Sequence, residues 1–518
     1  MDFFDEFVQA IVLGEVTDRG GVIALKKKLS KKHHIHRMPK NHEILSRVPE
    51  EYREIVEPLV RNKPIRTMSG VAPVAVMTSP YDCPHGRCTY CPGGTSNNTP
   101  QSYTGREPAA LRAVANDYDP YRETKSRLEQ LRAIGHRTDK VDLIVMGGTF
   151  TSRPTEYQDW FVKRCFDAMN GTDSPDIESA HLLNETAKAR CVGLTIETRP
   201  DWFDKARLTH SMYLGATKVE FGVQILDDAV LDGVKRGHHV KQVVDATKRA
   251  KDAGLKLCYH IMPGLPGSSK DRDLRSFRLM FEDERFRPDM LKIYPTLVVK
   301  GTELYDLWQD GKYSPMSLDE TIELLAQIKK GIPPWVRVLR IQRDIPVQLI
   351  EAGVKKSHLR QLVMTKLKEE GTPCRCIRCR EVGHVPRAAE LPSSVDVELS
   401  ETVYHASDGI EHFLSFEVPS IDSLVGYARL RFPGGSARSA LLRELHVYGQ
   451  MVPFEERADG SWQHRGYGLR LLSECEARAS EAGFDKVRVT SGVGARNYYR
   501  RLGYERSGYY MTKPLARA

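Results

Sequence analysis

The stretch YDCPHGRCTYCPGG, residues 81–94, decides the fold of this chain. It places Cys83, Cys88 and Cys91 in the pattern C-x4-C-x2-C, with Tyr90 directly before the last cysteine. Three thiolates on one loop form a site for a soft metal. Three cysteines on a four-iron cluster leave one iron free to bind a small molecule. The alternative is a structural zinc knuckle, in which His85 provides the fourth ligand.

Short runs rich in β-branched and apolar residues surround this loop, and helical segments separate them. The predicted strands cover residues 71–79, 141–148, 192–198, 218–224, 256–264 and 290–298. Strands that alternate with helices predict an α/β fold with a parallel sheet, and six strands fit a partial, TIM-like (βα)6 barrel. Loops that follow the strands carry the chemistry of a barrel, and the cysteine loop follows the first strand.

A new βα pattern begins near residue 396. It predicts strands near 411–418, 424–432 and 440–448, a helix at 467–482 and a strand at 486–491. The segment QHRGYG, residues 463–468, lies directly before this helix. A glycine-rich helix start brings several backbone N–H groups together and suits a phosphate. The candidate binding residues are therefore Gln463, Gly466, Tyr467 and Gly468, although any glycine-rich helix start fits the same pattern.

Both segments resemble known families. The cysteine loop resembles that of the radical S-adenosylmethionine (SAM) enzymes, with a first gap that is one residue longer. The order of strand, glycine loop, helix and strand resembles the GNAT acetyltransferases, whose loop holds the pyrophosphate of acetyl-CoA. Tyr498 and Tyr499 follow in that order. One of their hydroxyls could protonate a departing thiolate, or both rings could be core aromatics.

The combination of the two segments, with ELHVYG at 444–449 and SGVGARNYY at 491–499, resembles the catalytic third subunit of Elongator. The chain looks like a stand-alone prokaryotic member. The resemblance implies an enzyme that forms a carboxymethyl group on carbon 5 of the wobble uridine of tRNA. Cys83, Cys88 and Cys91 would hold a [4Fe-4S] cluster that cleaves SAM, and the glycine loop would hold acetyl-CoA. A radical from the acetyl methyl group would add to the uracil ring, and thioester hydrolysis would follow.

Three further cofactor residues come from the same resemblance, besides Tyr90. Gly147 and Gly148 resemble the glycine pair that meets the amino group of SAM, but Thr149 stands where many radical SAM enzymes have glutamate. Lys300 follows a predicted strand and could contact phosphates of RNA or of acetyl-CoA. An ordinary surface lysine is the alternative.

A second group of cysteines, Cys374, Cys376 and Cys379, lies between the two βα patterns. We interpret it as a zinc knuckle with His384 as the fourth ligand, because structural zinc sites close with four ligands. Such a knuckle would staple the linker between the two catalytic halves. A loop of free cysteines is the alternative.

The N-terminal region is strongly basic. No acidic residue occurs between Arg19 and Glu43, and the whole chain carries a net charge of +9. Clustered cations bind phosphate backbones, so this region is a candidate for nucleic-acid binding. The resemblance implies that its target is the anticodon stem-loop of tRNA. The candidate contacts are Lys26, Lys27, Lys28, Lys31, Lys32 and Arg37. A solvated basic arm without a partner is the alternative.

The length of 518 residues predicts several domains. We divide the chain into a tRNA-binding region at 1–75, a radical SAM barrel at 76–345, a zinc-knuckle linker at 346–395 and a GNAT domain at 396–518. Six of the ten cysteines lie in two groups with metal-ligand spacing, and the chain shows no signal peptide and no long apolar run, which predicts a cytoplasmic protein without a membrane span. A homodimer is one option, and Elongator-type partner subunits are not expected to be required.

Two competing functions share parts of this pattern. A protein lysine acetyltransferase with a structural iron–sulfur site would use the acetyl-CoA loop alone. A tRNA-binding scaffold with a decayed SAM site would use only the basic region, and Thr149 favours it.

Overall fold

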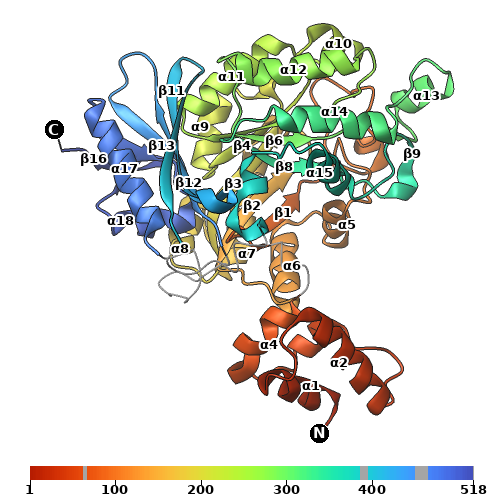
Figure 1. Cartoon of the computed structure of the whole chain (residues 1–518). Helices are drawn as coiled ribbons and strands as arrows, with labels where there is room; N and C mark the ends of the chain where they lie inside the picture. The colour runs from red at the N-terminus through yellow and green to blue at the C-terminus, as the bar shows by residue number, and fades with distance from the viewer. Residues whose placement is uncertain (62–66, 386–394, 450–464, 517–518) are drawn as a thin grey trace.

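The computed structural model describes residues 1–61, 67–385, 395–449 and 465–516. Its N-terminal part is a small helical lobe at the bottom of Figure 1. The lobe contains α1 (Phe3–Val12), α2 (Arg19–Lys32), α3 (Asn41–Leu45) and α4 (Arg53–Val60). Phe3, Phe7 and Val56 belong to a hydrophobic core that is separate from the rest of the molecule. The basic residues Lys26, Lys27, Lys28, Lys31 and Lys32 all lie on α2.

The central part is a seven-stranded sheet in which every neighbouring pair is parallel. Its order is β1 (Ala72–Met77), β2 (Lys140–Met146), β3 (Arg190–Thr198), β4 (Lys218–Gln224), β5 (Lys256–Ile261), β6 (Met290–Ile293) and β8 (Arg337–Ile341). All six predicted strands are confirmed, and β8 adds a seventh. The first and last strands of this order are not paired with each other, so the barrel is partial.

Helices surround this sheet, and most of them lie on its outer face (Figure 1). They are α5 (Pro108–Ala115), α6 (Pro120–Ala133), α7 (Thr155–Asn170), α8 (Ile177–Asn184), α9 (Lys205–Tyr213), α10 (Asp228–Gly233), α11 (Val240–Asp252), α12 (Lys270–Glu282), α13 (Glu303–Gln309), α14 (Leu318–Lys330) and α15 (Leu359–Glu369). A small antiparallel sheet of β7 (Val298–Val299) and β9 (Ile350–Ala352) lies beside α13. The strands bury mostly aliphatic residues against these helices, as parallel sheets do.

The C-terminal part is a second sheet of seven strands. Its order is β10 (Glu398–Ala406), β11 (Gly409–Val418), β12 (Ser423–Phe432), β13 (Ser439–Val447), β14 (Lys486–Val489), β16 (Tyr510–Pro514) and β15 (Glu505–Ser507). Only β13 and β14 are parallel, and they pair over just four residues. The helices α17 (Tyr467–Glu481) and α18 (Arg496–Arg500) complete this part, and the short α16 (Ile377–Arg380) precedes it.

The second sheet packs against the end of the barrel at which its strands begin. Arg443 of β13 donates to the carboxylate of Asp289, directly before β6, and to the carbonyl of Leu255, directly before β5, at 2.9 Å. Burial alone would raise the pKa of Asp289, but nearby cations, foremost Arg443, lower it to about 2. Lys251 and Glu411 join this fully buried network. The two sheets are therefore joined by ion pairs that water does not reach.

The fold contains no candidate for a bilayer-crossing helix in the part of the chain that the structure describes.

Candidate active sites

The cysteine loop lies directly after β1, at the end of the barrel opposite to the second sheet. Cys88 and Cys91 are buried, and Cys83 is half-buried. The backbone N–H of Ser102 donates to the sulfur of Cys91 at 3.2 Å. The ring Nε2 of His85 lies 3.1 Å from the sulfur of Cys88. Each contact holds a sulfur atom in a polar environment.

A buried arginine faces the same loop. Nη1 of Arg236 lies 3.7 Å from the sulfur of Cys88, and its Nη2 donates to the carbonyl of Gly222 at 2.6 Å. Arg199 fixes this segment, since its guanidinium donates to the carbonyls of Arg236 and Gly237 at 2.8 and 2.9 Å. A fixed positive charge stabilises a thiolate, which is the form of cysteine that binds metals.

The three sulfurs of this loop are not all within 4.8 Å of one another, unlike the other cysteine group among the described residues. A single tetrahedral zinc with Zn–S bonds of about 2.3 Å needs its sulfurs roughly 3.8 Å apart. A four-iron cluster binds each cysteine at a separate iron and needs a wider spacing. The geometry of Cys83, Cys88 and Cys91 therefore fits the cluster better than the zinc knuckle.

The turn of Gly147 and Gly148 packs on the cysteine loop. Both residues have positive φ, +128° and +93°, and a Cβ on Gly147 would overlap the side chain of Thr78. A Cβ on Gly148 would lie 3.4 Å from the carbonyl oxygen of Gln101. Thr149 turns toward the loop, and its hydroxyl lies 3.5 Å from the sulfur of Cys83. Only glycine fits this turn, which exposes its backbone beside the cysteines.

A cavity of about 310 Å³ extends from this loop into the barrel, and Tyr90 and Gly148 line it. Charged side chains face its interior. His260 lies 2.7 Å from the carboxylate of Glu220, and Lys292 contacts both Glu220 and Glu197. Burial opposes ionisation of Glu220, but the cations, first Lys292, hold its pKa well below the usual range. Barrel interiors are normally packed with aliphatic residues, so buried charges mark a functional site.

Glu220, Glu197 and Arg236 were not identified as candidate site residues from the sequence. A signal for Glu220 was present, because polar residues alternate along β4 at positions 218, 220 and 224. Alternate residues of a strand share one face. No comparable signal existed for Arg236, which lies in a loop.

The glycine loop of the second sheet is partly described, because Gln463 lies outside the described residues. Gly466 has a φ of +86° and caps α17, which begins at Tyr467. A Cβ on Gly468 would lie 3.4 Å from the hydroxyl of Tyr498, which therefore faces the start of α17.

The structure separates the two candidate tyrosines. Tyr498 is half-buried, and burial raises the pKa of its hydroxyl. Tyr499 is buried in the hydrophobic core of the second sheet, where its ring packs on Tyr504. Only Tyr498 places its hydroxyl at the glycine loop.

Lys300 is exposed and lies beside the cysteine loop. The carbonyl of the next residue, Gly301, accepts a hydrogen bond of 2.8 Å from Arg87 of that loop. The adjacent helix α13 and the glycine-loop helix α17 are on opposite sides of the molecule in Figure 1. Lys300 is therefore not close to the loop expected to hold acetyl-CoA.

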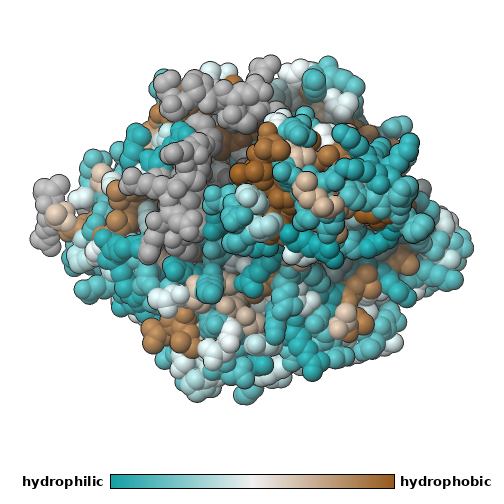
Figure 2. Space-filling model, turned by 90° about the horizontal axis from the view of Figure 1, so that it is seen from below, coloured by the Kyte–Doolittle hydropathy of each residue, from teal (hydrophilic) through white to brown (hydrophobic). Residues whose placement is uncertain are grey.

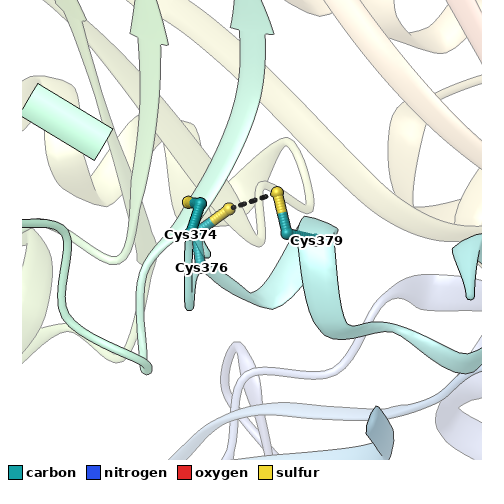
Figure 3. Close-up of side chains that lie close together, drawn as sticks. All are labelled: Cys374, Cys376 and Cys379. Atoms are coloured by element: carbon teal, nitrogen blue, oxygen red, sulfur yellow. Dashed lines mark hydrogen bonds between the residues drawn. The ribbon is translucent and has the colours of Figure 1, made fainter. Parts of the chain in front are cut away.

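The second cysteine group is compact, and its three sulfurs lie within 4.8 Å of one another. Figure 3 shows Cys376 and Cys379 pointing toward each other, with sulfurs 3.6 Å apart. This spacing fits a tetrahedral zinc. His384 is not brought into the group, because its Nε2 contacts the carboxylate of Glu381 at 2.7 Å. Instead the ammonium of Lys329 lies 3.7 Å from the sulfur of Cys379.

This cysteine group connects the barrel to the second sheet. The backbone N–H of Ile377 donates to the carbonyl of Val336 at 3.0 Å, next to β8. Arg380 donates to Asp422, between β11 and β12, at 2.9 Å. This position agrees with a structural role in which the cysteine group connects the barrel to the second sheet.

The basic residues of the N-terminal lobe divide into paired and unpaired ones. Lys26 is buried and donates to Asn41 at 2.8 Å, Lys32 pairs with Glu6, and Arg37 pairs with Glu43. Lys27, Lys28 and Lys31 are exposed on α2, and none has an ion pair within the described ranges. Figure 2 views the molecule from the side of this lobe, and hydrophilic residues cover most of that face.

Four family models match the chain. They are the ELP3 N-terminal domain at residues 1–68, the Radical SAM superfamily at 78–280, the Radical_SAM C-terminal domain at 288–369 and the Acetyltransferase (GNAT) family at 389–504. The match to a radical SAM barrel joined to a GNAT domain confirms the predicted fold.

Relatives align over nearly the whole chain. A protein of Methanocaldococcus jannaschii named tRNA uridine(34) acetyltransferase is 50% identical over 93% of this chain and 92% of its own length. Human Elongator complex protein 3 is 43% identical over 99% of this chain and 96% of its own length. The solved structure of Methanocaldococcus infernus Elp3, lacking residues 1–46, has 46% identity and a TM-score of 0.76, and the match covers 87% of this chain and all of that one. This chain therefore belongs to the family of the archaeal tRNA uridine(34) acetyltransferases and Elongator complex protein 3, as a radical SAM and GNAT protein.

Proposed function

We propose that this chain uses SAM and acetyl-CoA to form a carboxymethyl group on carbon 5 of the wobble uridine of tRNA. One observation carries the proposal. A loop of three separated cysteines opens into a charged cavity, and the same chain places a tyrosine hydroxyl at a glycine-rich helix start. Relatives at 50% identity are named for acetyl transfer to tRNA uridine(34).

In the barrel, Cys83, Cys88 and Cys91 would hold a [4Fe-4S] cluster, which when bound supplies the electron that cleaves SAM. The chain prepares this site with its own residues. Arg236 places a positive charge against Cys88, and the turn of Gly147 and Gly148 leaves its backbone free to meet the amino group of SAM. The buried walls of the cavity keep water away from reactive groups.

In the second sheet, the loop from Gln463 to Gly468 would hold the pyrophosphate of acetyl-CoA with backbone N–H groups. Thioester hydrolysis breaks the C–S bond, and the departing sulfur needs a proton. Tyr498 would donate it, since a raised pKa keeps its hydroxyl protonated near neutral pH.

The wobble base lies in a single-stranded loop, from which it can be flipped into a pocket. The exposed Lys27, Lys28 and Lys31 would contact the backbone of the anticodon stem. Lys26, Lys32 and Arg37, which are paired in the structure, would contribute less.

Zinc at Cys374, Cys376 and Cys379 would be structural, with no part in turnover. A cytoplasmic location follows from the tRNA substrate and from the many free cysteines. A homodimer and independence from Elongator-type subunits stay predictions.

One assay tests the function against its alternatives. The anaerobic, iron-loaded protein is incubated with tRNA, acetyl-CoA, SAM and a reductant, and nucleosides are analysed by mass spectrometry. Carboxymethyluridine supports the proposal. Acetyl-lysine on a protein, without a modified nucleoside, would favour the lysine acetyltransferase, and binding of tRNA alone would favour the scaffold.

The tRNA contact has its own test. The triple variant K27Q/K28Q/K31Q is compared with K205Q/K270Q/K368Q, which neutralises three exposed lysines elsewhere on the surface. We expect weaker tRNA binding only for the first variant, with the slope of log Kd against log salt reduced by up to about 3. Equal dissociation constants at moderate salt would rule out this interface.

A further inference from the structure

Helix α18, which carries Tyr498, is held by the barrel rather than by its own sheet alone. Glu185, directly after α8, accepts hydrogen bonds from Arg496 at 3.3 Å and from both terminal nitrogens of Arg500. Its backbone carbonyl accepts from Asn497 at 3.1 Å. The carboxylate side chain is only 4% exposed. Three of the five residues of α18 therefore contact one buried residue of the other catalytic half.

The loop that leads into α18 lies directly on the first residues of β3. A Cβ on Gly492 would overlap the backbone of Val192. A Cβ on Gly494 would lie 2.9 Å from the backbone nitrogen of Cys191. Both positions leave no space for a side chain, so the contact is backbone against backbone.

The anchor itself is rigid. Asn184, fully buried beside Glu185, accepts from the backbone N–H of Cys191 at 2.7 Å and donates to the carbonyl of Ala189 at 3.0 Å. These bonds fix the end of α8 to the start of β3. The opposite end of β3 provides Glu197, which lines the cavity beside the cysteine loop. One strand of the barrel thus contacts the loop before α18 at its start and lines the cavity at its end.

We infer that Glu185 is a positioning residue for Tyr498, through which the radical SAM barrel sets the geometry of thioester cleavage in the GNAT domain. A helix of five residues does not hold its shape by itself. Its orientation comes from its contacts, and a charge pair that loses one partner leaves the other buried and unpaired. A displacement of about 1 Å in a catalytic group can cost about 100-fold in rate.

This inference rests on the proposed role of Tyr498, and Glu185→Gln in the full-length, metal-loaded protein tests it. Release of free thiol from acetyl-CoA is followed in the presence of tRNA, and SAM cleavage is followed separately. We expect kcat for thiol release to fall about tenfold or more, while KM for acetyl-CoA and the rate of SAM cleavage change less than about threefold. An unchanged kcat overturns the inference.

A double-mutant cycle distinguishes a role in positioning Tyr498 from a general disturbance of the domain structure. In a Tyr498→Phe background, Glu185→Gln should not lower kcat for thiol release any further. Both substitutions remove the same contribution to catalysis, which is the correctly placed hydroxyl of Tyr498. Additive losses would contradict the inference. The matched control is Asp485→Asn, which breaks the exposed ion pair with Arg438 in the same domain and should leave kcat unchanged. If Glu185→Gln does not fold, Arg500→Gln breaks the same ion pair by changing the residue on α18 instead.

Hydrogen exchange keeps the inference separate from the proposed function. If the wild type releases no thiol under any condition, the proposed function fails. The amides of residues 496–500 should still exchange faster in Glu185→Gln than in Asp485→Asn. Equal exchange rates in the two variants would overturn the positioning role, whatever the activity.

Discussion

The two cysteine groups share the same ligand count and differ in geometry. Each has three cysteines and one cation at 3.7 Å from a sulfur, Arg236 in the first group and Lys329 in the second. The first group is spread over a loop and opens into a cavity of about 310 Å³. The second is closed within 4.8 Å and packs among core residues of the barrel. We therefore expect the spacing of the sulfurs and the space in front of them, rather than the number of cysteines, to distinguish a reactive site from a structural one.

Loss of one cysteine from the first group should give the largest effect. Cys88→Ser removes the sulfur that faces Arg236, so we expect the iron and sulfide content after anaerobic reconstitution to collapse. Formation of 5′-deoxyadenosine from SAM should fall at least about 100-fold. Zinc content and the thermal unfolding midpoint should stay at wild-type values. Full iron content in this variant would remove the distinction between the two groups.

The corresponding change in the second group should act on stability. Cys376→Ser removes one of the sulfurs that are 3.6 Å apart, and we expect zinc to be lost and the unfolding free energy to fall by about 3 kcal/mol or more. Iron content per folded molecule should not change. The check is metal analysis together with thermal unfolding. Zinc content and stability equal to those of the wild type would contradict the zinc knuckle and favour a loop of free cysteines.

The two cations provide a finer comparison. Arg236→Gln removes a positive charge beside the proposed cluster, so its reduction potential should become more negative, on the order of tens of millivolts. Lys329→Met removes a charge at the same distance from a sulfur of the other group and should leave the potential unchanged. Redox titration followed by electron paramagnetic resonance measures both. A shift in the lysine variant, or none in the arginine variant, would contradict the assignment.

The smallest effect is expected at His384. Because its Nε2 contacts Glu381 and lies outside the sulfur group, His384→Ala should keep its zinc. The lost hydrogen bond should cost about 1 kcal/mol of stability. Zinc loss equal to that of Cys376→Ser would identify His384 as the fourth ligand after all.

Much of the fold follows from periodicity in the sequence. The six strands predicted for the barrel are all present, because apolar runs flanked by glycine are unambiguous in parallel sheets. β8 was missed because Arg337 and Arg340 interrupt its apolar pattern. Arg337 is buried only because Glu381 and Tyr448, distant in the sequence, accept its hydrogen bonds. A single sequence does not show such partners.

The candidate sites show the same difference between features of local sequence and contacts between distant segments. Local motifs singled out residues that the structure brings together, the cysteine loop with the glycine turn and the three cysteines of the second group, while their roles stay predictions. Contacts between distant segments were not visible in the sequence. Nothing local distinguishes Tyr498 from Tyr499, yet one faces α17 and the other lies in the core. Likewise, the hydrogen bond of Lys26 with Asn41 depends on how α2 and α3 pack against each other.

The buried ion network between the two sheets makes each half of the molecule depend on the other. If the halves were separated, Arg443, Arg431 and Lys251 would each lose a partner across the junction. Each half would then carry charges that had lost a buried counter-ion, which costs several kcal/mol for a buried pair. We therefore expect that neither half, expressed without the other, is as stable as it is in the full chain.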